Sequence, residues 1–471
     1  MKKGLVMDRK NIENIVKKVL EKLETEQKTA KTEELGLGVC SNMEIAIEKA
    51  SSAQKHYEKY SLNQREKLIN HLRRELTNFV EEISEMTVNE TGMGKVKDKI
   101  KTNLLAIEKT PGVEDLSTQA FTGDNGLTLI ELSAFGVVGS ITPVTNPTET
   151  IINNTISALA AGNSIVFSPH PNALKVSKYL VRVINEIIED LKDYPKNLVT
   201  ISKTSGKNDV EELFNHVDVD LLVVTGGTEI VNKALRSGKK VIGAESGNPP
   251  VIVDESANIT KAAKDIVSGA SFDNNLLCVS EKSVLVIDDV TDYLTFCMQK
   301  EGAIQIENIS DIEKLQNCIL KDGKPNENYV GKSPTVILKN AGIQFEGNPK
   351  LIIVETDILH PFVQEELLMP VVPVVRQKDF DTALKNAIQV EGKRNNTAII
   401  HSQNVSRLSE AAKKIKTTIF VKNAPSYVGL GFEGEGYVGF TIAGRTGEGI
   451  VSAKDFARRR RCVLSGSFSI R

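Results

Sequence analysis

Short apolar runs separated by helical patterns are the feature that most constrains the fold of this chain. The runs SIVFSP, VDLLVVTGG, VIVD and SVLVI are nearly continuous in apolar residues, and longer amphipathic stretches lie between them. Strands that are apolar on both faces are typical of parallel sheets covered by helices on both sides. We therefore expect an α/β fold with parallel sheets.

The pattern restarts after Gly247, which indicates two α/β units, and 471 residues are too many for one core. Residues 41–112 predict mostly helix, and residues 126–142 predict strands. The C-terminal segment RRRRCVLSGSFSI also has the character of a strand. Further strands are expected at TVILK, LIIVE, TAIIH and TIFVK.

Residues 1–24 stand apart as an amphipathic helix with apolar residues at helical spacing, and Asp8 is a suitable N-cap. Residues 25–38 are polar and aperiodic, and we interpret them as a linker. An isolated helix of this length is marginal in water, so it should dock on its own domain or on another protein. The linker favours another protein. The apolar residues are Ile12, Ile15, Val16, Val19, Leu20 and Leu23.

Charge and cysteine content exclude several classes of protein. The formal net charge of -2 is unlike that of a nucleic-acid-binding protein, and no apolar run is long enough to span a bilayer. The five cysteines are widely spaced and include no CxxC pair, so no metal site is expected. Reduced thiols in the cytoplasm are the preferred interpretation.

Two strand–helix junctions have residues suited to a ligand. In VVTGGTEIVNKAL, a buried strand runs into Gly226 and Gly227 and then a helix, whose first N–H groups suit a pyrophosphate. In ITPVTNPTET, Thr145 and Asn146 expose hydroxyl and amide groups at a turn. Ordinary tight turns use the same residues, so the pattern alone leaves both interpretations open.

Cys278 lies among apolar residues in FDNNLLCVSEK. A lone cysteine in such surroundings is more often a packing residue than a nucleophile, and spacing alone does not decide between the two. A free thiol is only slightly ionised at neutral pH, so a nucleophilic site is expected to favour the thiolate. His170 and His360 are candidate bases by residue type only.

Seven segments in order resemble the aldehyde dehydrogenase superfamily over about residues 40–471: ITPVTNPTET, AAGNSIVFSPHPNA, VVTGGTEIV, ESGNPPVIVD, NNLLCVSEK, HPFVQEELLMPVVPVV and ARRRRCVLSGSFSIR. Within it, the chain resembles in particular the CoA-acylating propionaldehyde and acetaldehyde dehydrogenases of bacterial microcompartments. The resemblance implies a Rossmann-like NAD-binding domain over 39–241, with oligomerisation strands at about 118–138. It also implies an α/β catalytic domain over 242–431, and a return segment with a C-terminal oligomerisation tail over 432–471.

The resemblance also implies roles for single residues. Cys278 falls at the family's nucleophile position, and Asn146 or Thr145 falls at that of the oxyanion-stabilising Asn. Glu366 corresponds to the Glu that binds the nicotinamide ribose. Ser168 stands where hydrolytic relatives usually have a Lys, which implies a looser hold on NAD or room for CoA. The other implied cofactor-binding residues are Thr142, Pro143, Pro169 and His170, and Thr225, Gly226 and Gly227 beside the phosphates.

The position of the water-activating base departs from the hydrolytic pattern. Hydrolytic members have a general-base Glu in a motif like ELGGKxP, but alignment on Pro250 places Ala244 there and Glu245 one residue later. The resemblance then implies transfer of the acyl group from Cys278 to coenzyme A with ping-pong kinetics. If Glu245 reaches the thioester, a hydrolytic dehydrogenase is the alternative. A non-catalytic scaffold associated with a shell is the third possibility.

The implied substrates are an aldehyde of two to four carbons, NAD and CoA, and the implied assembly is a homodimer or tetramer. Residues 8–24 resemble the encapsulation peptides that dock enzymes onto microcompartment shell proteins. The expected location is thus the cytoplasm, inside a microcompartment. Arg458–Arg461 are expected to be solvated or at the subunit interface rather than to bind CoA phosphate.

Overall fold

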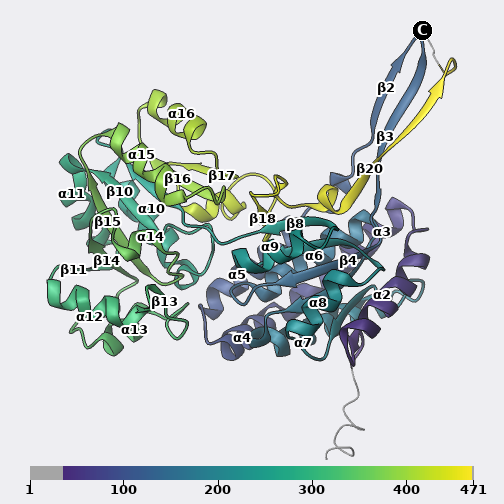
Figure 1. The fold of residues 1–471 in the computed structure, drawn as a ribbon, viewed down its shortest axis with the longest axis horizontal. Helices are drawn as coiled ribbons and strands as arrows, with labels where there is room; N and C mark the ends of the chain where they lie inside the picture. The colour runs from purple at the N-terminus through teal and green to yellow at the C-terminus, as the bar shows by residue number, and fades with distance from the viewer. Residues whose placement is uncertain (1–35, 469–471) are drawn as a thin grey trace, which may run out of the picture. The chain divides into compact units, whose positions relative to one another are not determined.

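The computed structural model describes residues 36–468 (Figure 1). The helix expected over residues 8–24 and most of the linker expected over 25–38 lie outside these residues. From Leu37 onward the chain forms one unit. Its main sheets are two parallel sheets and one three-stranded sheet. None of the helices in residues 36–468 is long and apolar enough to cross a membrane.

The first parallel sheet has six strands in the order β1-β6-β5-β4-β7-β8. In β7, Leu221 and Val223 pack in one helical layer, and Leu222 and Val224 pack in the opposite one. Burying each such side chain contributes about 1.5–3 kcal/mol. The first sheet extends past the boundary expected after residue 241. Its strands are β1 (Val39–Cys40), β4 (Val137–Thr142), β5 (Ser164–Pro169), β6 (Val199–Ser202), β7 (Val219–Thr225) and β8 (Lys240–Ala244).

Helices cover both faces of this sheet. One layer contains α2 (Met43–Tyr57), α8 (Lys207–Asn215) and α9 (Thr228–Leu235). The other contains α3 (Leu62–Leu76), α4 (Val80–Thr91), α5 (Val96–Lys109), α6 (Pro147–Ala161) and α7 (Leu174–Asp190). Helix α6 is buried over its whole length, and Pro147 occupies a first-turn position where its missing N–H breaks no helical bond. The helical prediction for residues 41–112 is confirmed.

The second parallel sheet has seven strands in the order β11-β14-β15-β10-β9-β16-β17. Helices α10 (Ile259–Ser271) and α11 (Asp288–Lys300) pack on one face, and α15 (Phe380–Glu391) and α16 (Val405–Lys414) on the other. Helix α12 (Ile309–Ile319) packs beside β14. The strands are β9 (Pro250–Val253), β10 (Ser283–Ile287), β11 (Ala303–Ile306), β14 (Leu351–Glu355), β15 (Val371–Gln377), β16 (Thr397–His401) and β17 (Ile419–Lys422).

The strand expected at TVILK is wrong, because these residues belong to helix α13 (Pro334–Ala341). Ser333 caps the helix by accepting the Val336 N–H, and Pro334 occupies the first turn. Gly342 ends the helix with φ 69. These capping residues determine the structure of a short apolar run whose periodicity fits both helix and strand. The other three predicted strands are β14, β16 and β17.

The third sheet is antiparallel and joins distant parts of the chain. It consists of β2 (Gln119–Gly123), β3 (Gly126–Ala134) and β20 (Ala457–Ser465), with β3 in the centre. Figure 1 shows these three strands side by side as a long, narrow sheet that extends away from the helices. Its side chains are largely exposed, and Phe121 is 58% exposed. The C-terminal strand predicted from the sequence is therefore present.

Candidate active site

The cofactor-binding residues implied by the resemblance lie at the carboxyl ends of three neighbouring strands. Strand β4 pairs with β5 on one side and with β7 on the other, so their ends form one edge. The order of strands reverses between β4 and β7, which is where open α/β sheets bind ligands. At this edge lie Thr142 at the end of β4 and Pro143 after it, Ser168 and Pro169 at the end of β5 and His170 after it, and Thr225 at the end of β7 with Gly226 and Gly227 after it.

Polar groups at this edge fit a dinucleotide. Thr142 and Ser168 are each 1% exposed, and neither hydroxyl oxygen has a hydrogen-bond partner. A buried hydroxyl without a partner costs free energy, and a polar ligand at this edge would relieve that cost. Gly227 precedes α9, and no side chain caps that helix. Its first N–H groups are therefore suited to an anion such as a phosphate.

Two other residues of this edge already have partners. The Thr225 hydroxyl lies 3.0 Å from that of Thr441, which belongs to the return segment. His170 is exposed, and its Nδ1 accepts the Asn172 N–H at 3.2 Å. The other candidate base, His360, likewise accepts the Phe362 N–H through Nδ1. Both histidines thus cap short helical turns.

The turn between β4 and α6 presents an unpaired amide. Asn146 precedes α6 and is 7% exposed, and its Nδ2 has no acceptor. An unpaired buried donor costs about 1–3 kcal/mol, and such donors stabilise an oxyanion when substrate arrives. The backbone oxygen of Thr145 instead accepts a hydrogen bond from the Lys99 ammonium. Of the two predicted residues, Asn146 therefore has the side chain suited to this role.

An unusual turn precedes Cys278. Asp273, Asn274 and Asn275 in η4 (Phe272–Asn275) have φ values of 47, 54 and 65. Left-handed residues other than glycine cost of the order of 1–3 kcal/mol each, and Asp and Asn tolerate them best. Side-chain hydrogen bonds hold the turn. Asn274 Nδ2 donates to the Gly331 oxygen at 2.8 Å, and Asn275 Nδ2 donates to the Ala270 oxygen at 2.9 Å.

Cys278 follows this turn and is partly exposed. Burial and the Glu366 carboxylate raise the pKa of its thiol to about 11, while the Asn396 side chain and Lys282 lower it. In the protein alone, desolvation thus outweighs the favourable partners. The expectation that backbone donors or the charge of a bound cofactor favour the thiolate stays a prediction.

Glu366 and Lys282 are the ionisable groups that act on Cys278. Burial raises the pKa of Glu366 to about 7 and lowers that of Lys282 to about 8. Lys282 Nζ donates to the Asn275 oxygen at 2.7 Å, which holds the turn before Cys278. Glu366 accepts the Gly247 N–H at 3.3 Å. Gly247 passes so close that a Cβ there would lie 2.5 Å from the Cys278 oxygen.

The residues around the position of the hydrolytic base are held by the return segment. Ala244 is the last residue of β8, and the Glu245 carboxylate forms an ion pair with Arg445. The structure thus gives Glu245 a partner other than a water molecule.

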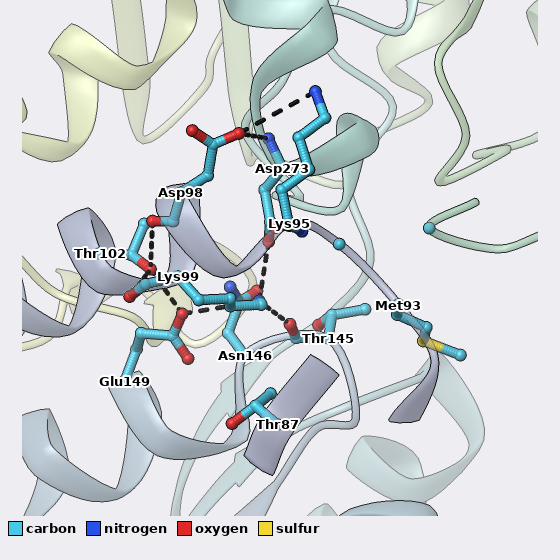
Figure 2. A network of polar contacts seen from close by, with 12 residues as sticks. Thr87, Met93, Lys95, Asp98, Lys99, Thr102, Thr145, Asn146, Glu149 and Asp273 are labelled. Carbon is cyan, nitrogen blue, oxygen red and sulfur yellow. Dashed lines mark hydrogen bonds and ion pairs between the residues drawn. The ribbon is translucent and has the colours of Figure 1, made fainter. Parts of the chain in front are cut away.

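Three residues near these groups were missed by the sequence analysis. Asn396 and Lys99 lie far from Cys278 in sequence and carry no motif that marks them. Lys282 is only four residues after Cys278, and this closeness in the sequence was a usable signal. Figure 2 shows Lys99 between Asp273, which precedes Cys278, and Glu149 and Thr145.

The comparisons with known proteins agree with this arrangement. A model described as aldehyde dehydrogenase family matches residues 20–308. A CoA-propanoylating propanal dehydrogenase of Salmonella typhimurium is 46% identical over 99% of this chain and 100% of its own. The chain belongs to the aldehyde dehydrogenase family.

Two solved structures are similar in fold as well as in sequence. A Rhodopseudomonas palustris propionaldehyde dehydrogenase with bound CoA and an acylated cysteine is 50% identical, with a TM-score of 0.90 over 92% of this chain and 99% of that one. A propionaldehyde dehydrogenase from the fucose utilisation microcompartment of Clostridium phytofermentans is 47% identical, with a TM-score of 0.90 over 92% and 100%. The expected α/β aldehyde dehydrogenase fold is confirmed.

Proposed function

We propose that this protein oxidises a short-chain aldehyde, such as propionaldehyde or acetaldehyde, with NAD and transfers the acyl group to coenzyme A. The observation that carries this proposal is Cys278, a partly exposed thiol beside Glu366, Lys282 and Asn396. The Rhodopseudomonas relative, which binds CoA and carries an acyl group on a cysteine, supports the same chemistry. Residues 39–241 bind NAD, and residues 242–431 carry the nucleophile.

In the first half of the reaction, Cys278 Sγ loses its proton and forms a bond to the aldehyde carbon. Glu366, whose pKa of about 7 allows it to gain a proton at neutral pH, takes the proton that this thiol loses. The carbonyl oxygen becomes an oxyanion, which the Asn146 amide and the Cys278 N–H stabilise. The dinucleotide, when bound at the edge of β4, β5 and β7, accepts the hydride. A thioester on Cys278 remains.

In the second half, the thiolate of CoA attacks the thioester carbon, and Cys278 leaves as a thiolate. The ion pair between Glu245 and Arg445 favours a thiol over water as acceptor, because no free carboxylate stands at the position of the hydrolytic base. The aldehyde and CoA therefore react one after the other at Cys278, which predicts ping-pong kinetics.

An assay of product and acceptor tests the proposal. The purified protein is incubated with aldehydes of two to four carbons and NAD or NADP, with and without CoA, and acyl-CoA is measured by mass spectrometry. We expect NADH and acyl-CoA in equal amounts, and no activity for Cys278→Ala. NADH formation at full rate without CoA would identify a hydrolytic enzyme. No NADH with any of these aldehydes would favour a scaffold.

The relative from a microcompartment supports an encapsulation role for residues 8–24. These residues dock on a shell protein through the apolar face of Ile12, Ile15, Val19 and Leu23, and the enzyme is located inside the compartment. Ile15→Ser/Val19→Ser should abolish co-purification with shells but leave kcat unchanged, whereas Lys17→Ser should leave both co-purification and kcat unchanged. Co-purification of the first variant would contradict the docking role.

The exposed apolar side chains of the three-stranded sheet support a role in a homodimer or tetramer. Phe121, Val463 and Leu464 are all exposed, although such residues usually need a covering partner. Light scattering should give a mass of two or four chains. Val463→Asp/Leu464→Asp should shift that mass toward one chain, and an unchanged mass would place the interface elsewhere.

A further inference from the structure

Lys99 is a fully buried lysine at the start of α5, with 0% of its surface exposed. Its ammonium lies 2.7 Å from Asp273 Oδ2 and 3.5 Å from Glu149 Oε1, and it donates to the Thr145 oxygen at 2.5 Å. Its ammonium thus makes one hydrogen bond, to a backbone oxygen, and two ion pairs with buried carboxylates. Burial alone would lower the pKa of Lys99, but the two carboxylates raise it. Lys99 is therefore a buried cation.

The acceptors of Lys99 come from two segments that carry the reaction. Thr145 shares a peptide plane with the N–H of Asn146, so a hydrogen bond to the Thr145 oxygen also fixes the backbone before Asn146. Glu149 lies in the first turn of α6, which Asn146 precedes. Asp273 begins the left-handed turn that leads to Cys278. Figure 2 shows the single ammonium between these segments.

Other contacts from α5 also reach the two segments, and the Thr102 hydroxyl donates to Glu149 Oε1 at 2.6 Å. The Asn146 side chain has no hydrogen bond from its Nδ2 to hold its orientation. Asp273 is bound from α5 by two further contacts. Its N–H donates to Asp98 Oδ2 at 3.0 Å, and its Oδ1 accepts the Lys95 N–H at 2.8 Å. Helix α5 thus supports the turn before Cys278, and Lys99 extends that support to the backbone oxygen of Thr145.

We propose that Lys99 is a positioning residue that fixes the amide of Asn146 relative to the thiol of Cys278. Its ammonium touches no reacting atom, and it acts by holding the peptide before Asn146 and the turn before Cys278 on the same cation. This inference rests on the proposed function, because the distance between an oxyanion donor and a nucleophile matters only if both take part in one reaction. A displacement of about 1 Å at such a site can cost about a hundredfold in rate.

Lys99→Met removes the charge and the hydrogen bonds but keeps an unbranched side chain. We expect kcat to fall by about tenfold or more, while KM for aldehyde, NAD and CoA changes by less than about threefold. The matched control is Lys109→Met on the same helix, because Lys109 Nζ also donates to backbone oxygens, those of Gly431 at 2.7 Å and Gly434 at 2.8 Å. The control should lose thermal stability without losing kcat.

A double-mutant cycle distinguishes positioning from general damage. If Lys99 acts through Asn146, Lys99→Met should lower kcat by at most about twofold in an Asn146→Ala background, since the amide that it orients is gone. Losses that simply multiply would overturn the proposal. A kcat equal to that of the wild type in folded Lys99→Met would overturn it too.

A second variant keeps the test informative if Lys99→Met does not fold. Lys99→Met/Asp273→Asn removes a cation and an anion together, and Asn accepts the left-handed backbone at this position. The remaining Glu149 keeps hydrogen bonds from the Thr102 and Thr148 hydroxyls at 2.6 and 3.1 Å. This variant should show the same loss of kcat, and full activity would overturn the proposal. Wild-type protein without aldehyde oxidation would instead refute the proposed function.

Discussion

The carboxylate of Glu245 forms an ion pair with the guanidinium of Arg445, which lies two hundred residues later in the return segment. Glu245 directly follows Ala244, the last residue of β8 and the one that alignment on Pro250 predicts at the position of the hydrolytic base. The pair joins the strand end beside the cofactor edge to the return segment. The Glu245 carboxylate is therefore already paired with the Arg445 guanidinium.

This pairing predicts that Glu245 is dispensable for the reaction with CoA. In Glu245→Gln, kcat with saturating CoA should stay within about threefold of the wild type, because an ion pair near the surface contributes little. Glu448→Gln, which breaks the comparable ion pair with Lys240, is the matched control. A loss of about a hundredfold confined to Glu245→Gln would show that this residue acts as a base. The rate of acyl-CoA formation, measured by mass spectrometry, gives kcat for both variants.

The unpaired amide of Asn146 predicts a large difference between neighbouring residues. Asn146→Ala removes the buried donor, and kcat should fall by about 10²–10³ because the oxyanion loses a hydrogen bond. Thr145→Val should change kcat by less than about fivefold, since Lys99 binds the backbone oxygen and not the side chain. Steady-state kinetics measure both. Equal losses in the two variants would mean that the wrong residue has been chosen as the donor.

The two charged side chains that act on Cys278, Glu366 and Lys282, predict how its rate of alkylation changes when either charge is removed. Because Glu366 raises the thiol pKa and Lys282 lowers it, Glu366→Gln should speed alkylation of Cys278 at pH 8, and Lys282→Met should slow it. One pKa unit changes the thiolate fraction about tenfold. Iodoacetamide labelling of the peptide that contains Cys278, followed by mass spectrometry, gives the rates. Changes in the opposite directions would refute this electrostatic assignment.

The sequence predicted those parts of the site that follow from the order of strands. Thr142, Ser168 and Thr225 each end or nearly end a buried strand, and parallel strands bring such ends to one edge. The local apolar pattern was sufficient to predict these buried strands, whereas the cofactor-binding roles of the residues at their ends came from the resemblance. The nucleophile could be assigned only by resemblance, because nothing in the spacing of five cysteines distinguishes Cys278.

The contacts that the sequence did not predict join residues of distant segments. Asp273 binds Lys99, and Asn396 acts on Cys278, across more than a hundred residues in each case. Hydropathy patterns do not encode which polar side chains meet inside the protein. The error at TVILK has a local cause instead, since Ser333 and Pro334 start a helix that five apolar-rich residues alone do not reveal.

His401 at the end of β16 predicts a loss of stability in acid. It is 2% exposed, and burial lowers its pKa from the ordinary value near 6.5 to about 3. As pH falls below 6.5, the unfolded chain binds a proton at His401 while the folded chain does not, so stability falls until pH 3. At pH 5 this contribution amounts to about 2 kcal/mol relative to pH 7.

His401→Gln should therefore reduce the difference in unfolding free energy between pH 7 and pH 5 by about 2 kcal/mol. Exposed His56 is the matched control, and His56→Gln should leave that difference unchanged. Urea unfolding followed by circular dichroism at the two pH values measures it. Poorer packing of the glutamine lowers stability equally at both pH values, so only the pH-dependent difference bears on the titration. An identical difference in wild type and His401→Gln would show that His401 binds its proton in the folded protein as readily as in the unfolded chain.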